Sequence, residues 1–169
     1  GCYRNMFNAC IALITPPIMN FAADIPDYAY QQMFQGCSKL TTTPQMDHIK
    51  HIGSYGCSAM FKSCVVLTTS PEIHADRIDD YGCYQMCHSC KVMRIYSPIQ
   101  AKRLRDYACA QMFQNTCTST VASPRTVQAI LIDTVGQHAC EEMFFPAAAN
   151  YDRITGIDTL HLGRIEDYG

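Results

Sequence analysis

The chain has 169 residues, 48% of them hydrophobic and 17% charged, and its formal net charge is -2. This length suffices for one domain with a sizeable core. The 13 basic and 15 acidic residues form no basic stripe, which argues against nucleic-acid binding. No apolar run is long enough to span a bilayer. The chain opens inside a repeat without a signal-peptide pattern, so if the protein is secreted, we expect this sequence to be its mature form.

The dominant feature is an internal repeat of about 26 residues, each copy centred on a methionine. A small residue, Gly or Ala, lies four positions before most of these methionines, and a branched apolar residue lies eight positions before. Residues 158–169 form an incomplete last copy. We therefore expect one repeat domain spanning residues 1–169. The repeat anchors are Met6, Met33, Met60, Met86, Met112 and Met143.

The spacing inside each unit predicts a helix. Apolar and small residues recur at steps of three and four over sixteen positions, which is typical of one helical face. Ser70-Pro71 and Ser97-Pro98 resemble an N-cap followed by a proline at the first helical position. Residues 65–69 and 91–96 indicate short extended connectors. The prediction is an all-α tandem helical repeat of five to six units.

Eleven cysteines without zinc-type spacing indicate an oxidising compartment, and hence secretion. The alternative is a cytosolic protein with buried thiols. Each full unit has an early cysteine slot before the methionine and a late slot after it. On one helix the two slots are too far apart to bridge. We therefore predict disulfides between units, from late slot to next early slot: Cys37–Cys57, Cys64–Cys83, Cys90–Cys109 and Cys117–Cys140.

Three cysteines remain outside this scheme. Cys2 and Cys10 could bridge each other, bridge another molecule or be buried. Cys87 replaces the phenylalanine that follows the anchor methionine in other units, which favours a buried free thiol.

The two ends of the chain resemble complementary halves of one unit. Residues 162–169 match the first half, Arg77–Gly82, and residues 1–10 match the second half. The halves could close a ring, join molecules head-to-tail, or mark cleavage from a tandem precursor; the alternative is that they are degenerate caps. The predicted assembly contact comprises Cys2, Met6, Phe7, Cys10, Ile165, Tyr168 and Gly169.

Catalytic and metal motifs are weak in this sequence. The only CxxC, Cys87–Cys90, lies within a repeat, and His48 with His51 lacks a carboxylate partner that recurs in every unit. We expect no catalytic residue, no metal and no cofactor. The longest departure from the repeat is 146–157, where an insertion could lie on a binding face. Its candidate binding loop is Asn150, Tyr151, Asp152 and Arg153.

These features favour a non-enzymatic, secreted structural protein that self-assembles head-to-tail into a filament through a helix split between its termini. The expected partner is a further copy of the chain, with no nucleic acid and no membrane span. One alternative is an extracellular module that holds a small apolar ligand in a centre lined by Met and Phe. The other is a defence or inhibitor protein that acts through the 146–157 loop.

Overall fold

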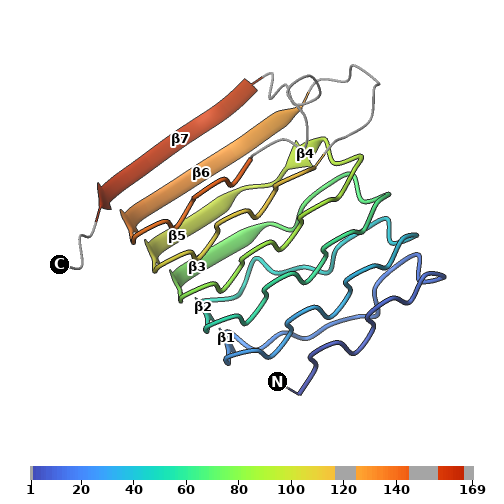
Figure 1. Ribbon diagram of the computed structural model, residues 1–169. Coiled ribbons are helices and arrows are strands. Elements are labelled where there is room, and N and C mark those ends of the chain that lie inside the picture. The colour runs from blue at the N-terminus through green and yellow to red at the C-terminus, as the bar shows by residue number, and fades with distance from the viewer. Residues whose placement is uncertain (1, 117–124, 145–155, 166–169) are drawn as a thin grey trace.

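The computed structural model describes residues 2–116, 125–144 and 156–165, and these form a β-solenoid (Figure 1). The chain winds into flattened coils that stack along one axis, and one repeat unit makes one coil. The described residues contain no α-helix. The all-α prediction is therefore wrong, and the repeat is a parallel β structure.

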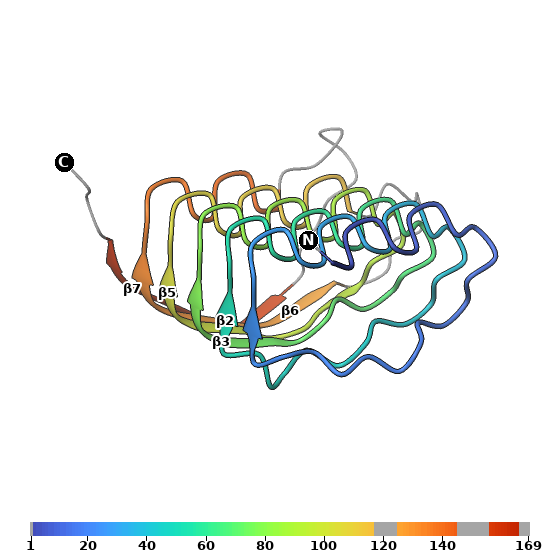
Figure 2. The ribbon, with the colours of Figure 1, turned by 90° about the horizontal axis from the view of Figure 1, so that it is seen from below.

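One long side of the coils is a seven-stranded parallel sheet (Figures 1 and 2). The strand order is β1-β2-β3-β5-β6, with β4 paired to the start of β6 and β7 paired along β6. The strands are β1 (Asp24–Ile25), β2 (His51–Ile52), β3 (Ile73–Ile78), β4 (Ile95–Tyr96), β5 (Ile99–Leu104), β6 (Thr126–Val135) and β7 (Gly156–Ile165).

The branched residue eight positions before each anchor methionine from Met33 onward, together with Ile165 of the incomplete last copy, fixes the register of this sheet. These residues pair in succession across the strands, because each circuit of the coil returns the chain to the same point one strand further on. Branched side chains suit a half-buried pleated surface, which explains their selection at this position. The aligned residues are Ile25, Ile52, Ile78, Leu104, Val135 and Ile165.

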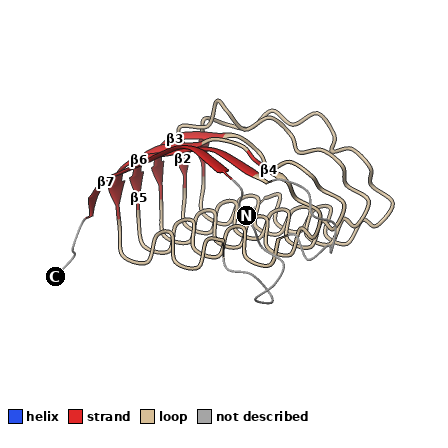
Figure 3. Ribbon diagram, turned by 90° about the horizontal axis from the view of Figure 1, so that it is seen from above, coloured by secondary structure: helices blue, strands red, loops and turns tan. Residues whose placement is uncertain are grey.

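The opposite long side is a ribbon of consecutive turns, shown in tan in Figure 3. Its amides alternate between two kinds of partner. The Met60 amide donates to the Cys57 carbonyl of its own coil at 3.2 Å, and the Phe61 amide donates to the Met86 carbonyl of the next coil at 2.8 Å. We call this the turn ribbon; its described segments are 2–9, 27–36, 54–63, 80–89, 106–115 and 137–144.

The turn ribbon explains why the sequence resembled a helix. A left-handed residue recurs every fourth position, as at Tyr55, Ala59 and Ser63, whose φ angles are 56°, 52° and 63°. Equivalent side chains therefore recur every four residues, close to the period of a helix. A helix would bond each amide to the carbonyl four residues back. Here every second amide bonds to a neighbouring coil, a partner that the pattern within one unit does not reveal.

The predicted helix starts have a different role. The Ser70 hydroxyl accepts a hydrogen bond from the Ser97 amide at 2.9 Å, and the Ser97 hydroxyl donates to the Ser70 carbonyl at 2.7 Å. These serines therefore join adjacent coils instead of capping helices.

The core lies between the sheet and the turn ribbon. Each inner coil contributes a methionine, an aromatic or cysteine neighbour, and the inward residues of its strand. The anchors Met33, Met60, Met86 and Met112 are all 0% exposed. Stacking of coils buries them on both sides, because each coil covers the apolar surface of the next.

Candidate functional site

The N-terminal end of the stack carries apolar side chains that inner coils bury. Met6 is 57% exposed, whereas Met33, its equivalent in the next coil, is 0% exposed. The Tyr3 ring stacks on Tyr30 and the Phe7 ring stacks on Phe34, each with centroids 5.3 Å apart. These side chains are thus packed on one face and uncovered by any described residue on the other.

The backbone at this end presents unused acceptors. The amides of Tyr3 and Phe7 donate to the second coil, at 3.1 and 2.9 Å. The carbonyls of Cys2, Arg4 and Met6 accept no backbone hydrogen bond from the described part of the chain. The equivalent carbonyls in the second coil all accept hydrogen bonds from amides of the first coil. The three carbonyls of the first coil are therefore positions that a further coil would fill in the same way.

The C-terminal end carries the matching apolar surface on β7. Leu160 and Leu162 are 55% and 51% exposed, whereas their partners on β6, Ile130 and Ile132, are 5% and 0% exposed. Ile165 is 76% exposed. Within the described part of the chain, β7 pairs only with β6, and an edge strand of this length is a template for further pairing.

The last turn-ribbon segment presents unused donors. In the coil before it, the amides of Cys109, Gln111 and Phe113 each donate to this segment at 2.8 Å. The equivalent amides one coil later donate to no described backbone acceptor; they are those of Cys140, Glu142 and Phe144. The two ends of the stack are therefore complementary in hydrogen bonding, with acceptors at one end and donors at the other.

The predicted assembly residues occupy these two ends. Cys2, Met6, Phe7 and Cys10 lie in or directly after the first turn-ribbon segment, and Ile165 ends β7. The two groups are at opposite ends of an open stack (Figure 1), so the described residues form no closed ring. The proposed contact is a divided coil and not a divided helix. Tyr168 and Gly169 lie outside the described residues.

The cysteines are free thiols throughout the described residues, so the prediction of a disulfide-rich protein is wrong. Equivalent slots stack on each other because the coils run parallel, which places early slots beside early slots and late slots beside late slots. The predicted late-to-early pairs would join different parts of the coil. The free cysteines of that scheme are Cys37, Cys57, Cys64, Cys83, Cys90, Cys109 and Cys140; Cys117 lies outside the described residues.

Burial governs the chemistry of these thiols. Desolvation raises the pKa of the Cys140 thiol to about 12 and raises the pKa of Cys57 and Cys64 further still. Cys87 is buried as well, and burial raises the pKa of its thiol well above the usual value. The inner thiols therefore stay protonated and act as small apolar side chains.

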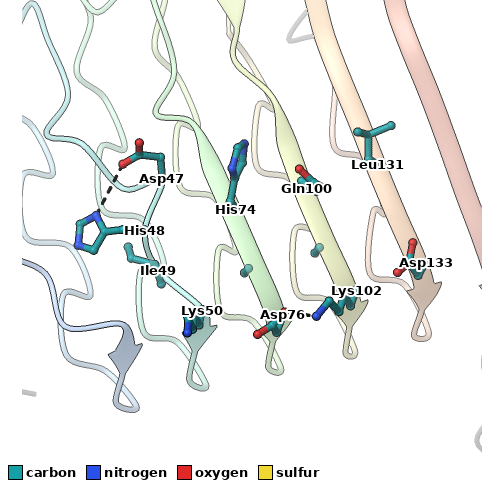
Figure 4. A pocket seen from close by; sticks show the side chains of 12 residues that line it. Asp47, His48, Ile49, Lys50, His74, Asp76, Gln100, Lys102, Leu131 and Asp133 are labelled. Atoms are coloured by element: carbon teal, nitrogen blue, oxygen red, sulfur yellow. Dashed lines mark ion pairs between the residues drawn. The ribbon is translucent and has the colours of Figure 1, made fainter.

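An open groove of about 590 Å³ lies on the outer face of the sheet (Figure 4). Charges of alternating sign cross it on neighbouring coils: Lys50, Asp76, Lys102 and Asp133. Lys102 Nζ lies 2.6 Å from Asp76 Oδ1, and this contact lowers the pKa of the Asp76 carboxyl. Both side chains are exposed, so solvent screens the pair and the groove neutralises much of its own charge.

This charge row was not identified from the sequence, although the repeat contained the signal. Each of the four residues lies ten positions before its anchor methionine, so alignment of the units would have shown the alternation. His48 and His74 line the same groove, and their ion-pair partners are local: Asp47 at 3.6 Å and Glu72 at 2.9 Å.

Comparison with known proteins gives no functional precedent. No protein-family model, curated protein or solved structure matches the chain. Within the described residues, no three metal-ligating side chains gather into a metal-binding group. That same part of the chain contains no helix suited to crossing a membrane. The candidate binding loop, Asn150 to Arg153, lies outside the described residues.

Proposed function

We propose that the chain is a non-enzymatic structural protein whose copies stack end to end, the first coil of one copy covering the C-terminal end of another. The observation that carries this proposal is the complementarity of the two ends. Inner coils join by a fixed set of amide-to-carbonyl bonds, and each end presents one half of that set. Because the coils stack along one axis, such a heterologous contact would extend the stack without closing a ring, and so produce a filament.

The spacing of the open groups supports this contact. Donors at Cys140, Glu142 and Phe144 and acceptors at Cys2, Arg4 and Met6 both fall on every second residue. In the register of the inner coils, Cys140 would donate to Cys2, Glu142 to Arg4 and Phe144 to Met6.

The side chains extend the same register. Phe144 stacks on Phe113 with centroids 5.3 Å apart, and Phe7 would stack on the outer side of Phe144 in the joined filament. Met6 would lie against Met143 and be buried there, as the other anchor methionines are. Contact between copies would thus cover the apolar surface that a solenoid end otherwise needs a polar cap to shield.

The packed interior of the coil argues against the alternative function, a module that holds a small apolar ligand. Side chains fill the space between sheet and turn ribbon, with Phe34, Phe61 and Phe113 at most 1% exposed. The inference of secretion also loses its premise, because it depended on disulfides that the described cysteines do not form.

Two variants, each with one end of the stack blocked by a charge, test the proposal. Met6→Lys places a charge on the N-terminal end, and Leu162→Lys places one on the C-terminal end. In sedimentation velocity across a concentration series, the wild-type chain should form a ladder of species and each variant alone should remain monomeric. An equimolar mixture should form dimers and nothing larger, because each variant retains one competent end.

A matched control uses the groove. Gln100→Lys adds the same charge to the outer face of the sheet, away from both ends, and should leave the ladder unchanged. A wild-type chain that remains monomeric at all concentrations would overturn the proposal. A mixture of the two variants that assembles beyond dimers would show that the contact is not head-to-tail.

A further inference from the structure

Among the described residues, the cysteines of the late slot form a stack in which only the first is exposed. Cys10 is exposed, whereas Cys37, Cys64 and Cys90 are each 0% exposed. Each buried thiol donates a hydrogen bond to a phenylalanine carbonyl one coil earlier, at 3.1 to 3.2 Å. The stack therefore connects an accessible thiol to a protected one in the adjacent coil.

One carbonyl oxygen brings the first two members together. The Phe7 carbonyl accepts the Cys10 amide at 3.1 Å and also accepts the Cys37 thiol at 3.1 Å. Neighbouring strands lie about 4.8 Å apart in a sheet. That separation falls within the Cα–Cα range of roughly 4.4 to 6.8 Å found in disulfides. The shared carbonyl acceptor and the coil spacing thus bring Cys10 and Cys37 close enough for side-chain rotation to join their sulfurs.

The two thiols differ in reactivity. Burial raises the pKa of the Cys37 thiol, opposed in part by a hydrogen bond from the Cys10 backbone. Cys37 therefore stays protonated and out of reach of an oxidant in solution, whereas exposed Cys10 meets the oxidant first. An exposed thiol beside a second thiol that resolves its oxidation is the usual arrangement of a redox-sensitive pair.

We propose that Cys10 and Cys37 are a peroxide-sensitive pair whose disulfide staples the first turn-ribbon segment to the second coil. Hydrogen peroxide oxidises the Cys10 thiol to a sulfenic acid and releases one water. The Cys37 sulfur then attacks the Cys10 sulfur, forming the S–S bond and expelling hydroxide, which leaves with the Cys37 proton as a second water. This proposal does not depend on end-to-end assembly.

The test uses reduced protein that carries Leu162→Lys, which blocks any copy from covering the first coil. Equimolar hydrogen peroxide is followed by alkylation and by digestion at basic residues and before aspartates. This digestion separates Cys2 (1–4), Cys10 (5–23) and Cys37 (27–39). Mass spectrometry should find peptide 5–23 joined to peptide 27–39.

Two further substitutions in the Leu162→Lys background test whether Cys37 is the thiol that resolves the oxidised Cys10. With Cys37→Ser, Cys10 should accumulate as a sulfenic acid that dimedone traps. With Cys64→Ser, the Cys10–Cys37 bridge should form as before, because that thiol lies one coil further in. A bridge between peptides 1–4 and 5–23, or equal dimedone trapping with and without Cys37, would overturn the proposal.

Discussion

The Tyr81 ring lies face to face on the Tyr107 ring, with centroids 4.9 Å apart and planes 4° from parallel. Tyr55 stacks on Tyr81 in the same way, at 4.9 Å. This separation equals the spacing of neighbouring strands, about 4.7 to 4.9 Å. A residue repeated once per coil therefore stacks on its equivalents in the neighbouring coils, and the coil spacing sets the distance between them.

The phenylalanine stack should be a major contributor to stability. Phe61 is fully buried, and its ring centroid lies 5.6 Å from that of Phe34. We expect Phe61→Ala to lower the free energy of unfolding by about 3 to 5 kcal/mol, because it leaves a cavity between coils. Urea denaturation would measure this loss. Phe7→Ala, which truncates a ring packed on one face only, should cost clearly less; equal costs would contradict the stacking account.

Alanine-to-glycine changes should have opposite effects at two positions of the turn ribbon. Ala59 has a φ of 52°, a conformation that costs a residue with a Cβ about 1 to 2 kcal/mol. We expect Ala59→Gly to leave thermal stability unchanged or raised. Ala108 is not among the left-handed residues, so Ala108→Gly should destabilise by about 1 kcal/mol. Calorimetry of both variants checks this, and a clear loss for Ala59→Gly would count against the turn ribbon.

Stability should fall steeply at alkaline pH. The folded Cys140 thiol has a pKa of about 12, against an ordinary value of 9.0. Below pH 9 this thiol is protonated in both states; above it, ionisation favours the unfolded chain until the folded pKa is reached. Each such thiol adds a loss of about 1.4 kcal/mol per pH unit. Urea unfolding from pH 7.5 to 10 should show this decline.

Removal of one buried thiol provides the control for that decline. Burial alone raises the pKa of Cys57, so Cys57→Ala should lose stability at neutral pH yet show a shallower decline above pH 9. An unchanged slope would mean that the buried thiols do not cause the alkaline loss.

Thiol labelling should distinguish stacked free cysteines from disulfides. In the folded, reduced protein we expect iodoacetamide to modify Cys2 and Cys10 rapidly, since both are exposed, and the buried thiols only on unfolding. After unfolding without reductant, at least ten of the eleven cysteines should react, because the ten described ones are free thiols. Intact mass spectrometry counts the adducts. Four late-to-early bridges would leave eight cysteines unmodified.

The repeat can be recognised from the amino-acid sequence alone. The anchor methionines, the branched residue eight positions earlier and the cysteine slots all recur at corresponding points of the coils, as the alignment of Ile52 with Ile78 shows. It also indicated that the chain ends resemble halves of one unit. Both features follow from residue types that recur at a fixed spacing, which can be seen directly in the sequence.

The backbone structure that the repeat forms depends on contacts between coils that are distant in the sequence. Gly56, Met60 and Cys64 are spaced like residues on a helix face, but here the first two belong to the turn ribbon and Cys64 directly follows it. The Phe61 amide donates to the Met86 carbonyl, 25 positions along the chain. Ile78 lies in a sheet whose neighbouring strands belong to other coils. Because a solenoid coil satisfies half of its ribbon amides through its neighbours, a single unit does not specify its own backbone. The cysteine partners follow the same rule, since parallel stacking brings each slot beside its equivalent.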